Sequence, residues 1–196
     1  SNVYFADLRG KVNKITNGNH MLTMNDLVGK NAVATWTDPS NPMDILYFNI
    51  QNTDKMRRLT NVNKDIFYNV EFGKVEEITY KSVDEKMIQG WIVKPPFFDS
   101  SKKYPLVLRI HGGPHSMYHV GFNYNFQLHA AQDQVVLYTN PRGSTGYGYD
   151  FANAIQNDYP GNDYDDIMAG VDEVVSRGYI DDNKMYVYGG SGGGVL

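Results

Sequence analysis

The sequence contains no cysteine. This absence excludes a disulfide framework, a thiolate zinc site and a catalytic thiol, and it suits the cytoplasm and the periplasm equally. A metal site built on histidine is also not expected. His115 and His119 have i, i+4 spacing, but the Glu of an H-E-x-x-H metallopeptidase motif is missing. We therefore expect no metal and no cofactor.

Long apolar runs and basic clusters are also absent. No stretch approaches the roughly 20 apolar residues of a membrane-spanning helix, and no charged start precedes an apolar run as in a signal peptide. The formal net charge is −4, and the only basic pairs are Arg57-Arg58 and Lys102-Lys103. A nucleic-acid surface needs a basic patch or stripe. We expect neither a membrane nor a nucleic-acid partner, while a homo-oligomer stays open.

The first 72 residues contain an internal repeat. Tyr4-Phe5 precedes a polar turn and a segment that ends in Ile15-Thr16-Asn17. Tyr47-Phe48 precedes a polar turn and a segment that ends in Leu59-Thr60-Asn61. The aromatic pairs lie 43 residues apart and the Thr-Asn pairs 44 apart. A period of about 40–45 residues is typical of a four-stranded propeller blade.

Two similar hairpins in another all-β domain are the alternative to a propeller. A propeller closes with about 4–8 blades, and residues 1–72 have strand pattern for only one or two. We predict that residues 1–72 are the C-terminal part of a β-propeller. The expected strands cover residues 3–8, 12–16, 45–50 and 56–60.

From residue 73 the pattern becomes that of an α/β domain. Short apolar runs bounded by Gly or Pro predict strands, the last three buried on both faces of a parallel sheet. The predicted strands cover residues 75–80, 88–93, 106–110, 135–138 and 184–188. An apolar stripe over residues 164–175 predicts a helix, with Asn162 or Asp163 as N-cap and Gly178 at an αL C-terminus.

A glycine-rich hexapeptide follows the last predicted strand. Residues 189–194 read Gly-Gly-Ser-Gly-Gly-Gly and satisfy the G-x-S-x-G pattern of a nucleophile elbow, with Ser191 as the nucleophile. The turn strains the serine backbone, and side chains two positions to either side would clash, so both positions need glycine. A Rossmann G-x-G-x-x-G motif that starts at Gly190 would need Gly or Ala at position 195, and a phosphate loop would need Lys there. Val195 fits neither motif. A flexible Gly-Ser linker is the structural alternative.

A second glycine pair follows the predicted strand 106–110. In His111-Gly112-Gly113 the glycines would let a backbone amide approach a substrate carbonyl oxygen, as in the H-G-G loop of α/β-hydrolases. The glycines could also serve a purely structural purpose, a tight turn that needs positive φ. This explanation is compatible with a role in binding the oxyanion.

Together these segments resemble the prolyl oligopeptidase family of serine peptidases, particularly its acylaminoacyl-peptidase and dipeptidyl-peptidase-like branch. The resemblance rests on HGGPHS at 111–116, NPRGSTGYG at 140–148 and GGSGGG at 189–194, in that order after propeller-like repeats. It implies that residues 73–196 are the N-terminal half of an α/β-hydrolase catalytic domain, preceded by the last one to two propeller blades.

The resemblance also implies roles for single residues. Ser191 would be the nucleophile and the N–H of Gly192 one oxyanion donor, with the second donor from Gly112 or Gly113. His111 stands where some relatives carry a Tyr hydroxyl, so it either binds the oxyanion or packs. Because Gly192 replaces the Tyr that often follows the serine, no side chain contributes from that position.

Arg142 and Tyr147 are further candidates for substrate binding. The structural alternative for Arg142 is a guanidinium paired with Asp163, Asp165 or Asp166. Tyr147 would line the pocket, although tyrosine is abundant here, with 15 residues.

The rest of a catalytic triad does not follow Ser191. The α/β-hydrolase order places the acid and the histidine after the serine, and none of the five later residues is Asp, Glu or His. His115 and His119, beside the H-G-G loop, would serve only in a rearranged site. We expect that the triad partners lie beyond Leu196 and that the 196-residue chain alone is inactive.

The sequence therefore predicts a serine peptidase that hydrolyses short peptides through an acyl-enzyme at Ser191. A carboxylesterase or lipase with a similar elbow is one alternative, and a non-catalytic propeller-based binding module is another. The propeller-like period favours the peptidase, because a gating propeller restricts access to short peptides.

Overall fold

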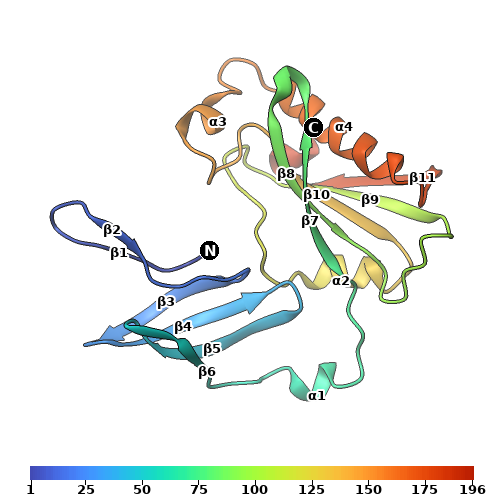
Figure 1. Ribbon diagram of the computed structural model, residues 1–196. Coiled ribbons are helices and arrows are strands. Elements are labelled where there is room, and N and C mark those ends of the chain that lie inside the picture. Colours follow the sequence, from blue (N-terminus) through green and yellow to red (C-terminus); the bar gives the residue numbers. More distant parts are fainter. The chain divides into compact units, whose positions relative to one another are not determined.

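The computed structural model describes residues 1–196, which divide into two units. The first unit comprises residues 1–71 and 119–123, and the second comprises residues 72–118 and 124–196. Each unit has its own sheet (Figure 1). No helix in either unit is long and apolar enough to cross a membrane.

The first unit is built from antiparallel strands. Its main sheet has four strands in chain order: β3 (Met21–Val28), β4 (Asn31–Asp38), β5 (Asn41–Asn49) and β6 (Asn52–Arg58). A separate hairpin precedes it, β1 (Tyr4–Ala6) and β2 (Val12–Lys14), and the short helix α1 (Lys64–Phe67) follows. Phe48 and Ala34 are fully buried in its small core.

The repeat in the sequence is also a repeat in the structure. In the β1–β2 hairpin the N–H of Val3 donates to the hydroxyl of Thr16 at 2.9 Å. After β6 the hydroxyl of Thr60 accepts from the N–H of Ile45, also at 2.9 Å. The residue before each threonine donates to the carbonyl of the same partner, at 2.8 and 2.7 Å. The β1–β2 hairpin is therefore the counterpart of the β5–β6 hairpin.

The second unit contains a five-stranded sheet of order β11-β9-β10-β8-β7. Its strands are β7 (Val75–Lys81), β8 (Met87–Val93), β9 (Tyr104–Ile110), β10 (Val135–Asn140) and β11 (Ile180–Gly189). All five strands predicted in this region are present. Strands β9, β10 and β11 are parallel, whereas β8 runs antiparallel to both its neighbours. The sheet is thus mixed, and the parallel arrangement predicted for the last three strands is confirmed.

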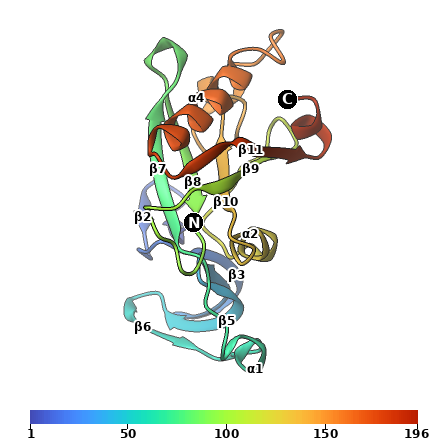
Figure 2. The same cartoon turned by 90° about the vertical axis from the view of Figure 1, so that its right-hand side faces the viewer.

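Helices cover both faces of this sheet (Figure 2). Helix α4 (Asn162–Ser176) packs Ile167 and Val171 in the same core as Leu137 of β10. Helix α2 (Tyr124–Ala130) packs Phe126 against the next residue of that strand, Tyr138, with ring centroids 4.5 Å apart. Successive side chains of a strand point to opposite faces, so α2 and α4 lie on opposite faces. The five-residue helix α3 (Tyr149–Asn153) precedes α4.

The predicted helix is confirmed as α4, with a different N-terminus. Gly178 has φ +83°, as an αL C-terminus requires. The N-cap is Gly161, which has no capping side chain, rather than Asn162 or Asp163. The Asp163 carboxylate instead accepts from the N–H of Gly161 at 2.6 Å. Asp163 thus caps the helix from within its first turn.

Strand β11 forms one edge of the sheet. Residues Met185, Tyr186 and Val187 are 46%, 55% and 62% exposed. The prediction that this strand is buried on both faces is therefore wrong, because no strand pairs with it on its outer side. The other two runs, in β9 and β10, are largely buried as predicted.

Candidate active site

Strand β11 ends in a sharp turn at Ser191. Gly190 is extended, with φ −122° and ψ 149°, and a single 3-10 turn, Ser191–Gly194, follows it. Ser191 has φ +57°, in the left-handed region that is unfavourable for a residue with a Cβ atom. Its side chain is exposed. The strand-to-helix bend and the strained serine backbone that the motif predicts are both present.

The glycines two positions before and after Ser191 are required by close backbone approach. A Cβ atom on Gly189 would lie 2.0 Å from the carbonyl oxygen of Gly193. A Cβ atom on Gly193 would lie 2.4 Å from the carbonyl oxygen of Ile110. Gly190, in contrast, faces open space. The hexapeptide is therefore a tightly packed turn on the sheet and not a flexible linker.

The H-G-G loop lies directly beside this turn. A Cβ atom on Gly112 would lie 3.3 Å from the Cβ of Ser191, and one on Gly192 would lie 3.3 Å from the nitrogen of Gly113. Gly113 has φ +132°, which favours glycine. The N–H groups of Gly113 and Gly192 donate no hydrogen bond within the chain. Two backbone donors from separate loops thus remain free near the serine, as an oxyanion site requires.

Comparison with known proteins agrees with this geometry. Residues 120–196 match the model of the prolyl oligopeptidase family. The chain is 40% identical over 165 residues to the uncharacterized peptidase YuxL of Bacillus subtilis, covering 84% of this chain and 25% of that protein. It is 30% identical over 187 residues to dipeptidyl-peptidase 5 of Porphyromonas gingivalis, covering 94% and 27%.

The solved structure of the acylaminoacyl peptidase of Pyrococcus horikoshii is also similar, with a TM-score of 0.86 at 28% identity. That match covers 98% of this chain and 30% of the peptidase chain. The chain belongs to the prolyl oligopeptidase family. The resemblance inferred from three glycine-rich segments is thereby confirmed. The chain spans about a quarter of the length of the two curated relatives.

Tyr159 also reaches the elbow of this prolyl oligopeptidase-family chain, and sequence analysis missed it. Its hydroxyl donates to the carbonyl oxygen of Gly192 at 3.0 Å. Burial raises the pKa of Tyr159, and the nearby Asp163 carboxylate raises it further. The hydroxyl therefore stays protonated at neutral pH and remains a donor. No sequence pattern links two residues that lie 33 positions apart.

His111 has a partner for each ring nitrogen. Its Nδ1 lies 2.7 Å from the carbonyl oxygen of Gly112, and its Nε2 lies 3.0 Å from the hydroxyl oxygen of Ser144. The ring meets Tyr118 edge-on, with centroids 5.2 Å apart. Burial lowers the pKa of His111, and the bond to Gly112 partly opposes this shift. Of the two readings for His111, the geometry matches the packed side chain.

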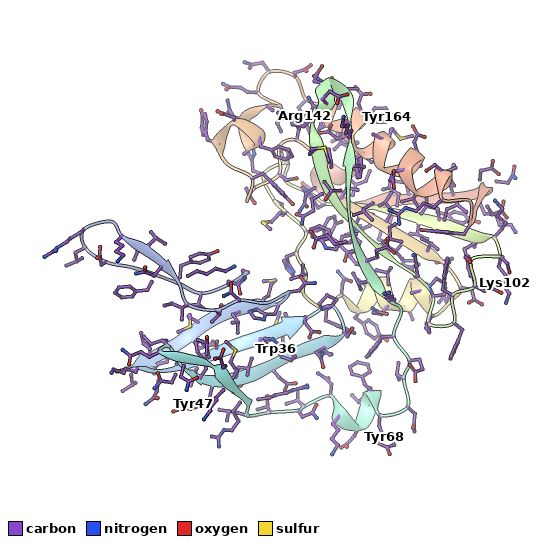
Figure 3. All side chains as sticks on the ribbon, in the orientation of Figure 1. Trp36, Tyr47, Tyr68, Lys102, Arg142 and Tyr164 are labelled. Atoms are coloured by element: carbon purple, nitrogen blue, oxygen red, sulfur yellow. The ribbon has the colours of Figure 1, made fainter.

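Arg142, labelled in Figure 3, forms ion pairs with two acidic side chains. Its guanidinium donates to the Asp166 carboxylate at 2.8 and 3.0 Å, and its backbone N–H donates to the same carboxylate at 2.8 Å. Asp166 is fully buried, whereas the second partner, Asp84 at 3.4 Å, is largely exposed. The bond to Asp166 raises the pKa of the guanidinium, which stays charged. The structure therefore shows the structural alternative for Arg142, a guanidinium paired with a carboxylate of α4.

Tyr147 is tied to the scaffold of the same family segment, 140–148. Its hydroxyl accepts from the Asn140 amide at 2.7 Å and donates to the Gln89 side chain of β8. The Asn140 amide group also bonds the backbone N–H and carbonyl of Tyr118, at 2.7 and 3.0 Å. This segment therefore supports the end of the H-G-G loop. Its role in binding substrate stays a prediction.

Proposed function

We propose that this chain carries the nucleophile and the oxyanion donors of a serine peptidase of the prolyl oligopeptidase type. One observation carries the proposal. Ser191 is exposed at φ +57° just after the parallel strand β11, with glycine at both positions where a Cβ atom would collide with the backbone. Such a bend presents one hydroxyl above the sheet. The names of the two curated relatives support a peptide as the substrate.

In the proposed reaction the Oγ of Ser191 attacks the carbonyl carbon of a short peptide. A histidine takes the serine proton and passes it to the leaving amine, and water then hydrolyses the acyl-enzyme. The N–H groups of Gly113 and Gly192 donate to the oxyanion, and each such donor contributes roughly 10²–10³-fold to kcat. The histidine and its orienting acid would come from residues outside this chain.

We further propose how the two units divide the fold. Strands β3 to β6 would form one propeller blade, and the β1–β2 hairpin would be the outer part of the blade before it. The equivalent bonds of Thr16 and Thr60 support this assignment. The second unit would be the N-terminal half of an α/β-hydrolase domain, which the turn at the end of a parallel strand supports.

The proposed activity is tested on the full protein that the gene encodes, not on the 196-residue chain alone. Its hydrolysis of peptide amides and of simple esters is measured. We expect turnover of short peptides that is lost in Ser191→Ala, while the thermal unfolding midpoint stays close to that of the wild type. Turnover of esters without peptides would favour the carboxylesterase alternative. A folded protein that turns over neither would favour the non-catalytic binding module.

A further inference from the structure

The hydroxyl of Tyr159 lies where a side chain on Gly192 would begin. Besides donating to the carbonyl oxygen of Gly192 at 3.0 Å, it lies 2.8 Å from the place of a Cβ atom on that glycine. The same place is 3.3 Å from the carbonyl carbon and the nitrogen of Gly113. The three residues therefore meet at one point, between the two loops that carry the proposed oxyanion donors.

The carbonyl that Tyr159 contacts belongs to the short turn that begins at Ser191. This carbonyl also accepts from the N–H groups of Val195 and Leu196, at 3.0 and 3.3 Å, so it points toward the C-terminal end of the turn. In a helical turn the N–H of a residue points the opposite way, toward the N-terminal end, where the first N–H groups have no partner. A contact that fixes the carbonyl of Gly192 therefore also restricts the direction of its N–H.

Tyr159 lies in a tightly folded connection between α3 and α4. The N–H of Asp158 donates to the carbonyl of Ile155 at 3.1 Å. A Cβ atom on Gly161 would lie 2.6 Å from the carbonyl oxygen of Asp158, and the N–H of Gly161 donates to the buried Asp163 carboxylate at 2.6 Å. The backbone on both sides of Tyr159 is therefore held in place, which limits the positions that its hydroxyl can reach.

We infer that Tyr159 is a positioning residue for the oxyanion site, an inference that rests on the proposed function. Its hydroxyl holds the carbonyl of Gly192 and thereby directs the N–H of that residue at the oxyanion. The hydroxyl also fills the space beside Gly192, so it requires glycine at this position. Tyr159 acts through Gly192 and forms no bond to the reacting atoms.

Tyr159→Phe removes the hydroxyl and keeps the ring. In the full gene-encoded protein we expect kcat for a short peptide to fall about 3- to 10-fold, with KM changed by less than about twofold, because a bond that orients the donor is lost and not the donor itself. The inhibition constant of a peptide aldehyde, whose adduct with a serine resembles the transition state, should rise by a similar factor. Tyr149→Phe is the matched control on α3, where Tyr149 is 78% exposed, and should leave all three constants unchanged.

The thermal unfolding midpoint gives a readout that does not depend on activity. We expect Gly192→Ala to lower the midpoint by about 2–5 °C, and this loss to be at least halved when Tyr159 is already replaced by Phe. An active protein in which Tyr159→Phe leaves kcat unchanged or alters KM alone, or equal losses in the two backgrounds, would overturn the positioning role alone. An inactive wild type with unequal losses would instead overturn the proposed function.

Discussion

Gly190 and Gly193 flank the same serine but have different surroundings. A Cβ atom on Gly193 would lie 2.4 and 2.8 Å from the carbonyl oxygens of Ile110 and His111, whereas one on Gly190 would meet nothing within 4 Å. We expect Gly193→Ala to lower the free energy of unfolding by about 1–3 kcal/mol, as overpacking does. Gly190→Ala, at φ −122°, should change it by less than about 1 kcal/mol. Urea unfolding of both variants measures the difference, and equal losses would contradict it.

Burial of His111 predicts a loss of stability in acid. Burial lowers the pKa of His111 from its ordinary value of 6.5, so the unfolded chain takes up a proton at a higher pH than the folded chain. The contribution of His111 is therefore complete above pH 6.5 and declines as the pH falls below it. His20 and His119 are shifted in the same direction, also chiefly by burial.

Urea midpoints at pH 7.5 and pH 5 test this prediction. We expect a lower midpoint at pH 5 in the wild type and a smaller drop in His111→Asn, which lacks the titrating ring. The same drop in both proteins would show that His111 contributes nothing to the acid sensitivity.

The Arg142–Asp166 pair joins the segment 140–148 to helix α4. Arg142→Met would leave Asp166 fully buried with an unpaired charge, which costs about 3–5 kcal/mol. Asp84→Asn changes a partner whose side chain is 72% exposed, and should cost less than about 1 kcal/mol. Chemical unfolding of both variants checks the ranking. The double variant Arg142→Met/Asp166→Leu should recover part of the loss, and no recovery would contradict the charge-based explanation.

The elements that form the candidate site were predictable because their signals are local. Strands β9 and β10 read as apolar runs, and the glycine spacing around Ser191 follows from clashes within one turn. Strands β3 and β4 were not predicted, because polar residues interrupt their alternation, as in MLTMNDLV. The antiparallel direction of β8, and the contacts of Tyr159 and Ser144, depend on residues far apart in the sequence. Residue spacing alone does not encode such contacts.

At the scale of the whole molecule, the outer edge of β11 is a surface that favours self-association. Its exposed Met185, Tyr186 and Val187 border a groove of about 270 Å³ that also reaches α4 and contains no candidate site residue. An exposed apolar edge strand is a template for pairing with another chain. We expect the 196-residue chain expressed alone to self-associate with rising concentration.

Sedimentation velocity of that chain measures the association. Val187→Lys should shift it toward monomer, because a charge on an edge strand opposes pairing. Lys102→Gln, remote in sequence from β11, is the control and should leave the association unchanged. A chain that stays monomeric at high concentration would contradict the prediction.

The central claim is that a packed backbone turn holds the Ser191 hydroxyl ready for attack. The most direct measurement is reaction of the gene-encoded protein with a fluorophosphonate probe, followed by mass spectrometry of the digested protein. We predict a single adduct on Ser191 that is absent in Ser191→Ala and after unfolding in urea. A folded protein with an unmodified Ser191, or with its adduct on another residue, would contradict the claim.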